Sequence, residues 1–227
     1  MAVPAGTLRV VSFDAAHTLI HLREPVGATY AAVARRFGLN LDPARLTKAF
    51  AAAWRTVPPP VSADGPRPDD GRGWWATVVQ ETMGGAGYTI PEFATYFAAL
   101  YKEFTRSGIW YLEDGTKELL ADLRAAGYRL GVLSNFDRRL YVVLDQLKIR
   151  EFFEHVVISS EVGVDKPDAR IFAELIQQFR VSPEQVLHVG DDPIVDGAAA
   201  IAAGLQTFVV GEDGTNLSDL RRALGLP

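Results

Sequence analysis

Four groups of polar residues in this chain stand at the ends of short apolar runs, where a buried strand would stop. They are FDAAHTL (residues 13–19), LSN (133–135), GVDKPD (163–168) and GDDPIVD (190–196). The carboxyl ends of parallel strands meet at one edge of a sheet, and ligands of α/β proteins bind there. We therefore expect one pocket that combines a carboxylate, a hydroxyl, an amine and an acidic cluster.

Transfer of a phosphoryl group to a carboxylate needs this combination, because the charge of the phosphate must be neutralised before an anion can attack it. Asp14 ends the first apolar run and is the candidate nucleophile. Ser134 and the backbone N–H of Asn135 would donate hydrogen bonds to the phosphoryl oxygens, and Lys166 would supply a positive charge. The sequence thus predicts a site in which these four residues are catalytic.

The acidic group at residues 190–196 is typical of a magnesium site. Mg²⁺ prefers hard oxygen ligands, and the chain contains no cysteine that could bind a softer metal. We expect Asp14 and Asp191 to ligate Mg²⁺, and Asp192 and Asp196 to hold its water molecules.

Each of these groups, taken singly, has an ordinary structural explanation. Asp14 would close a strand, Ser134 would cap a helix, Lys166 would be a surface charge, and Asp191 would precede a helix that begins near Pro193. What favours the functional interpretation is that all four groups end strands, in the required order.

The elements that must position these residues follow from the alternation of apolar runs. Residues 8–13 suit a strand that is buried on both faces. Beyond about residue 114, strand patterns at 128–133, 155–158, 185–189 and 206–210 alternate with helical patterns at 116–126, 140–147, 170–179, 194–203 and 217–224. This alternation predicts a doubly wound, Rossmann-like parallel sheet with helices on both faces.

Residues 21–112 show helical patterns without strand patterns and are predicted to be an inserted α-helical domain. Residues 1–20 and 113–227 are predicted to form the core. Helical spacing occurs at residues 26–37, 43–55, 74–83 and 91–105. Residues 57–73 are rich in Pro, Gly and Asp and predict a loop. Aromatic residues at helical spacing usually pack, so we assign to the interior of this domain Trp54, Trp74, Trp75, Tyr101 and Phe104.

Composition limits the partners. The formal charge is -5 and the pI is about 5.4, which argues against a nucleic-acid surface. No run of 18 apolar residues and no basic segment followed by an apolar one occurs, so we expect a cytoplasmic protein without a membrane partner. The expected partner is a small phosphorylated molecule.

The four ordered motifs resemble those of the haloacid dehalogenase-like superfamily. SNFDRRL (134–140), KPDARIF (166–172) and the pair Trp74-Trp75 are most similar to its subgroup of haloacid dehalogenase-like hydrolase domain-containing protein 3. The resemblance covers nearly the whole chain. It implies a magnesium-dependent hydrolase whose insertion after the first motif is a helical cap over the site.

One position departs from that family. Most phosphatases of the superfamily carry a second Asp two residues after the nucleophile, as acid and base, and here that position is Ala16. The family's metal ligand at this position is a backbone carbonyl, so Ala16 can still serve there. Loss of a positioned acid costs roughly 10² to 10⁴ in rate, so we expect slow turnover of unactivated alkyl phosphates.

Three explanations of this departure stay open. His17, where a glycine is common in the family, would shuttle the proton, although a locally bonded loop histidine is the plainer interpretation. A substrate with a good leaving group, such as an acyl phosphate, would need no acid. Phosphonoacetaldehyde hydrolases also carry Ala here but need a cap lysine, for which only Lys48 and Lys102 are available.

Three classes of function follow. The first is a phosphatase that forms an aspartyl-phosphate at Asp14. The second is a dehalogenase, in which Asp14 displaces halide from carbon and the acidic residues 191–196 have no use. The third is a catalytically weakened module that binds phosphate and Mg²⁺.

Overall fold

The computed structural model describes residues 8–62 and 64–226, and it divides the chain into two compact units. Unit 1 comprises Met1–His21, Ser62–Arg67 and Leu112–Pro227, and unit 2 comprises Leu22–Val61 and Pro68–Tyr111. The segment Ser62–Arg67 lies in the stretch for which the sequence predicts a loop of the helical insertion. It packs with unit 1 because Arg67 bonds there through both its backbone and its side chain.

A five-stranded parallel sheet forms the centre of unit 1. Its strands run in the order β5 (His155–Ile158), β4 (Arg129–Ser134), β1 (Val10–Phe13), β6 (Val186–Gly190) and β7 (Gln206–Val209). In the register, Phe13 pairs with Val132 on one side and with Val189 on the other. This parallel sheet confirms the predicted fold class.

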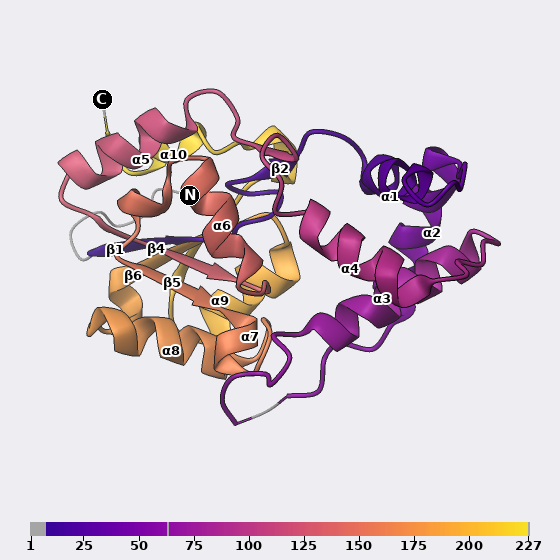
Figure 1. The fold of residues 1–227 in the computed structure, drawn as a ribbon. Coiled ribbons are helices and arrows are strands. Elements are labelled where there is room, and N and C mark those ends of the chain that lie inside the picture. Colours follow the sequence, from indigo (N-terminus) through magenta and orange to yellow (C-terminus); the bar gives the residue numbers. More distant parts are fainter. Residues whose placement is uncertain (1–7, 63, 227) are drawn as a thin grey trace. The chain divides into compact units, whose positions relative to one another are not determined.

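The sheet is buried because helices cover both of its faces. All four residues of β1 and all five of β6 are buried, as the near-continuous apolar runs predict. Figure 1 shows one face covered by α5 (Thr116–Ala125) and α6 (Arg139–Gln146), and the other by α8 (Ala169–Phe179) and α9 (Ala199–Ala202). The last helix, α10 (Asp219–Ala223), is tied to α5 by an ion pair between Arg221 and Asp122 at 2.7 Å.

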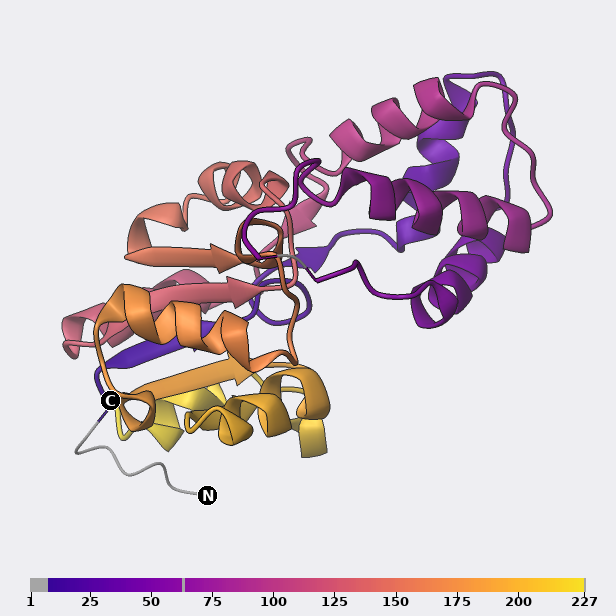
Figure 2. The same cartoon turned by 90° about the horizontal axis from the view of Figure 1, so that it is seen from below.

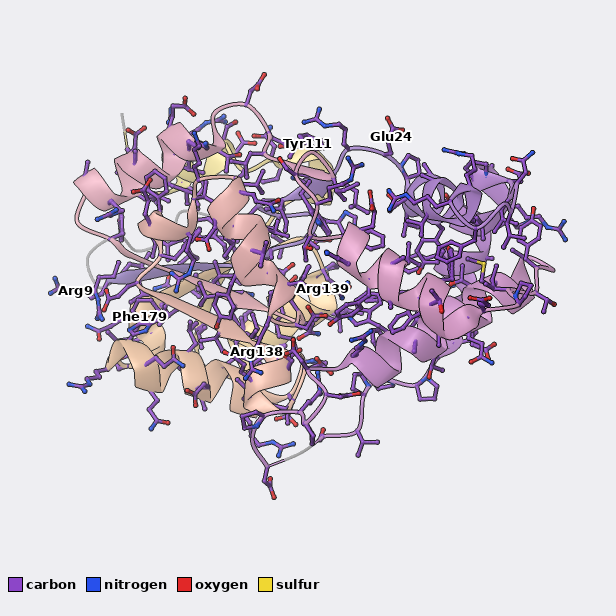
Figure 3. The ribbon with its side chains drawn as sticks, in the orientation of Figure 1. Arg9, Glu24, Tyr111, Arg138, Arg139 and Phe179 are labelled. Carbon is purple, nitrogen blue, oxygen red and sulfur yellow. The ribbon has the colours of Figure 1, made fainter. Side chains whose placement is uncertain are left out.

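The strands all point toward one edge of the sheet, as the arrowheads in Figure 2 show. Figure 3 marks the two ends of unit 1: Arg9 and Phe179 lie at the amino ends of the strands, and Arg138 and Arg139 lie at the carboxyl ends. The four polar groups predicted from the sequence follow strands at this carboxyl edge.

Unit 2 is built from α1 (Val26–Arg35), α2 (Pro43–Thr56), α3 (Arg72–Gly85) and α4 (Phe93–Glu103). Its core includes Tyr30 and Tyr96. The hydroxyl of Tyr96 donates to the backbone oxygen of Tyr30 at 3.1 Å. Trp75, Tyr101 and Phe104 pack against this core as predicted.

Trp54 departs from the predicted packing. Its side chain is half exposed, at 50%, and its ring contacts Phe50, Trp74 and Trp75. An aromatic cluster can therefore form on the surface of a helix pair, where helical spacing alone would place it inside.

Several short elements were not expected from the sequence. They include the paired strands β2 (His21–Leu22) and β3 (Trp110–Tyr111) and the single turn α7 (Ser159–Val162), while the helix expected at residues 194–203 begins with a π-helical turn at Pro193–Ala198. Elements this short leave no hydrophobic period to read. Among the described residues, no helix combines the length and apolar character needed to cross a membrane.

Candidate active site

Lys166 lies between two carboxylates at the carboxyl edge of the sheet. Its Nζ atom is 2.7 Å from Oδ1 of Asp14 and 2.5 Å from Oδ1 of Asp196. Lys166 is 4% exposed, Asp14 8% and Asp196 2%, so the three charges are almost removed from water. Paired and hydrogen-bonded charges of this kind tolerate burial, whereas a single one would not.

The electrostatics keep Lys166 and Asp196 ionised. Burial alone would lower the pKa of Lys166, but the charges of Asp14 and Asp196 outweigh it and raise that pKa. Burial would raise the pKa of Asp196, yet its hydrogen bond with His188 and the charge of Lys166 hold it well below the usual range. Lys166 therefore presents its positive charge to one oxygen of Asp14.

The side chain of Asn135 holds the loop that carries Lys166. Its Oδ1 accepts from the backbone N–H of Lys166 at 2.7 Å, and its Nδ2 donates to the backbone oxygen of Lys166 at 2.9 Å. The sequence assigned Asn135 a role through its backbone N–H alone, and this contact of its side chain was missed. The pair of bonds fixes the peptide of Lys166 to the end of β4.

Asp191 follows β6 and adds a third carboxylate. One ligand oxygen from each of Asp14, Asp191 and Asp196 can be chosen so that all three lie within 4.8 Å of one another. Burial, followed by the charges of Asp14 and Asp196, raises the pKa of Asp191. Because Lys166 offsets only part of this negative charge, the cluster can hold a metal ion.

Thr18, which the sequence analysis did not single out, holds Asp191. Its Oγ1 donates to Oδ1 of Asp191 at 3.3 Å, and Thr18 is buried. Both residues line a cavity of about 530 Å³ in unit 1. The cavity gives the third carboxylate access to solvent, with a lining that also includes His17, His21, Glu113 and Asn216.

The π-helical turn after β6 separates the roles of Asp192 and Asp196. The carboxylate of Asp192 accepts hydrogen bonds from the backbone N–H groups of Ile194 and Val195, each at 2.8 Å, and so caps the turn. It is not part of the carboxylate cluster of Asp14, Asp191 and Asp196. Asp196 points back at the strand end, where a Cβ on Gly190 would lie 2.2 Å from its Cγ. Glycine at position 190 is what allows this close approach.

A chain of buried polar groups behind Asp196 was also missed. His188 is fully buried in β6, with its Nε2 atom 3.2 Å from Oδ1 of Asp196 and its Nδ1 atom 2.9 Å from Oγ of Ser12 in β1. Burial lowers the pKa of His188, so the ring is neutral. A carboxylate only accepts, so Nε2–H donates to Asp196 and Nδ1 accepts from Ser12. The only signal in the sequence was one polar residue in each of two apolar strands.

The remaining predicted residues occupy the same edge. Ser134 ends β4 and is 2% exposed. Ala16 lies two residues beyond Asp14, and the next residue, His17, has a φ of 64°, in the left-handed region that favours glycine. The exposed ring of His17 lines the cavity beside Asp191.

Comparisons with known proteins agree with this arrangement. A family model described as haloacid dehalogenase-like hydrolase matches residues 8–204. Human haloacid dehalogenase-like hydrolase domain-containing protein 3 is 36% identical over 205 residues, which cover 89% of this chain and 82% of that protein.

Two solved structures share the fold at 20% identity. The HAD-hydrolase YfnB from Bacillus subtilis, solved bound to magnesium, has a TM-score of 0.73 and covers 96% of this chain and 99% of its own. An L-2-haloacid dehalogenase has a TM-score of 0.71, covering 92% and 88%. With the family model spanning most of the sequence, this chain belongs to the haloacid dehalogenase-like hydrolases, and within them it is similar to the domain-containing protein 3 subgroup.

Proposed function

We propose that this hydrolase is a magnesium-dependent phosphatase of small phosphorylated metabolites, with Asp14 as the nucleophile. The observation that carries the proposal is the buried contact of 2.7 Å between Lys166 and Asp14 beside two further carboxylates. A lysine alone would suffice to hold an ionised nucleophile. The additional negative charge of Asp191 and Asp196, which Lys166 offsets only in part, favours binding of a cation together with the substrate.

The steps that the protein's own residues perform follow from this geometry. The oxygen of Asp14 that is free of Lys166 attacks phosphorus, the bond to the leaving oxygen breaks, and an aspartyl-phosphate forms. Ser134 donates to a phosphoryl oxygen, and Lys166 offsets the charge that develops there. Water then attacks phosphorus, the bond between phosphorus and the Asp14 oxygen breaks, and the proton that the water loses passes to solvent, so that phosphate leaves and the Asp14 carboxylate is restored.

Magnesium would be held by Asp14, Asp191 and the backbone carbonyl of Ala16, with Asp196 binding its water. When bound, the ion supplies neutralisation of the phosphoryl charge. Ala16 has no group that could protonate a leaving alcohol. Good leaving groups, such as acyl or aryl phosphates, are therefore the substrates that this site suits best.

Two of the alternatives lose support from the side chains. A lysine that forms a Schiff base must lose its proton, which burial promotes, and both Lys48 and Lys102 are exposed on their helices. A dehalogenase that attacks carbon would not need the carboxylates of Asp191 and Asp196 next to its nucleophile.

The test is a panel of phosphate esters that includes acetyl phosphate, p-nitrophenyl phosphate and alkyl phosphates, each with Mg²⁺ and with EDTA. We expect phosphate release that requires Mg²⁺, and its loss in Asp14→Asn, a variant of the same shape. Turnover that survives EDTA or this substitution would refute the proposal. Chloride release from 2-chloropropionate would favour a dehalogenase, and phosphate binding without any turnover would favour the weakened module.

A further inference from the structure

A segment from the middle of the helical stretch returns to unit 1. The chain on both sides of Ser62–Arg67 belongs to unit 2, but this segment is part of unit 1. The backbone N–H of Arg67 donates to the carbonyl oxygen of Ser160 at 2.7 Å, in the turn α7 that follows the edge strand β5. Gly65 lines a cavity of about 340 Å³ with β5, α7 and α8. The segment is thus anchored at the edge of the sheet nearest the loop of Lys166.

The side chain of Arg67 makes a two-pronged ion pair with Asp165. Its Nη2 atom is 2.6 Å from Oδ2 and its Nη1 atom is 3.3 Å from Oδ1, while Nη1 also lies 3.3 Å from Oγ of Ser159. The side chains are only 9% and 19% exposed. A paired fork of this kind, shielded from water, fixes geometry far better than an exposed ion pair does.

Asp165 is the residue directly before Lys166. The peptide of Lys166 is bonded on one side to the side chain of Asn135, which comes from the end of β4. On the other side, Asp165 is held by Arg67. The loop that presents the buried amine is therefore fixed from two directions, one of them supplied by a segment 98 positions earlier in the chain.

We propose that Arg67 is a positioning residue for Lys166. The amine must meet Asp14 at 2.7 Å and Asp196 at 2.5 Å at the same time, which leaves little room for movement of the backbone. Displacement of a catalytic group by about 1 Å can cost 10²-fold in rate. This inference rests on the proposed function only where the readout is turnover.

The first arm measures turnover of p-nitrophenyl phosphate by variants of the pair. Arg67→Met should lower kcat/KM by roughly 10- to 100-fold, with most of the loss in kcat, because the charge is misplaced in the transition state. Arg67→Lys should recover only part of this, since an ammonium group cannot make two parallel bonds. Asp165→Asn should resemble Arg67→Met.

The matched control is Arg170→Met. Arg170 also pairs with an aspartate of the same loop, Asp168, at 2.8 Å, but it is 53% exposed and the pair is open to solvent. We expect less than about a two-fold change in kcat/KM, because exposed pairs fix little. A loss equal to that of Arg67→Met would mean that any change near the loop impairs the enzyme, and would overturn the inference.

A double-mutant cycle separates positioning from general damage. If Arg67 acts through Lys166, Arg67→Met should lower residual kcat/KM much less in a Lys166→Met background than in the wild type. Full additivity of the two losses would overturn the proposal. A fold defect, by contrast, would lower activity to the same extent in both backgrounds.

The last arm is independent of turnover. The backbone N–H of Lys166 is bonded to Asn135, so its hydrogen exchange reports on the order of this loop. Arg67→Met should speed that exchange at least 10-fold, while the amides of the distant strand β7 keep their wild-type rates. Unchanged exchange at Lys166 would overturn the inference even if no substrate were turned over. Faster exchange without any turnover would support the inference and count against the proposed function alone.

Discussion

The amine of Lys166 lies 2.7 Å from the carboxylate of Asp14, although 152 positions separate the two residues in the chain. The contact joins the loop after the edge strand β5 to the end of the central strand β1. It also brings Asp14, the proposed nucleophile, together with the amine of Lys166 and the acidic turn after β6.

Lys166→Met should destabilise the protein strongly. Without the amine, Asp14 and Asp196 face each other in a buried site, and breaking a buried pair on one side typically costs about 3–5 kcal/mol. Urea unfolding at pH 7 measures the loss. Lys117→Met, at an exposed position, should change stability by less than about 0.5 kcal/mol. Similar small losses in both variants would mean that the Lys166 contacts are weak in solution.

Ala16→Asp tests the missing acid. A carboxyl group at this position should raise hydrolysis of alkyl phosphates by about 10²-fold or more, and that of p-nitrophenyl phosphate much less, because the aryl leaving group needs little protonation. The comparison of kcat/KM for the two substrates is the measurement. Equal gains would contradict the interpretation. In the wild type, intact mass after addition of substrate should reveal phosphorylated Asp14, whose hydrolysis also lacks a base.

Asp191→Asn should have opposite effects with and without Mg²⁺. The pKa of Asp191 is raised by burial and by its acidic neighbours, so ionising it above its ordinary value of 3.8 opposes folding. Without metal at pH 7, the neutral variant should therefore be more stable than the wild type. With Mg²⁺, the wild type should gain stability and the variant should gain little. A metal-induced rise in melting temperature that is equal in both would argue against Asp191 as a ligand.

His188→Gln should make the free energy of unfolding depend less on pH below neutrality. Burial lowers the pKa of His188 below 6.5, so in the pH range just below 6.5 the imidazole is protonated in the unfolded chain but stays neutral in the folded protein. Stability then falls as pH drops below about 6.5, toward the folded pKa. Urea unfolding between pH 7 and 5 should give a smaller slope for the variant than for the wild type. Profiles with the same slope for His188→Gln and the wild type would contradict the burial argument.

His17→Gly separates strain from catalysis. The φ of 64° suits glycine, and a non-glycine residue held there costs of order 1 kcal/mol or more, so the variant should be at least as stable as the wild type. If His17 only occupies the loop, kcat for p-nitrophenyl phosphate should stay within about two-fold, as is usual for residues outside the chemistry. A large loss of kcat with unchanged stability would instead identify His17 as the group that moves the proton.

The sequence was sufficient for the fold because its signals are local. The apolar runs that end in Asp14 and Ser134 specify buried strands by themselves, and their alternation with helical patterns specifies a parallel sheet. Since all strands of such a sheet end at one edge, the order of the motifs also predicted that Asp14 and Lys166 would lie close together.

Tertiary structure decided the contacts that join residues distant along the chain. The fork of Arg67 on Asp165 and the bond from His188 to Asp196 leave no periodic trace in the sequence, because each depends on how two separately formed elements meet. Asp192 and Asp196 likewise look equivalent when read in order. Only the π-helical turn gives them different roles: it directs the carboxylate of Asp192 at the backbone of the turn and that of Asp196 at Lys166.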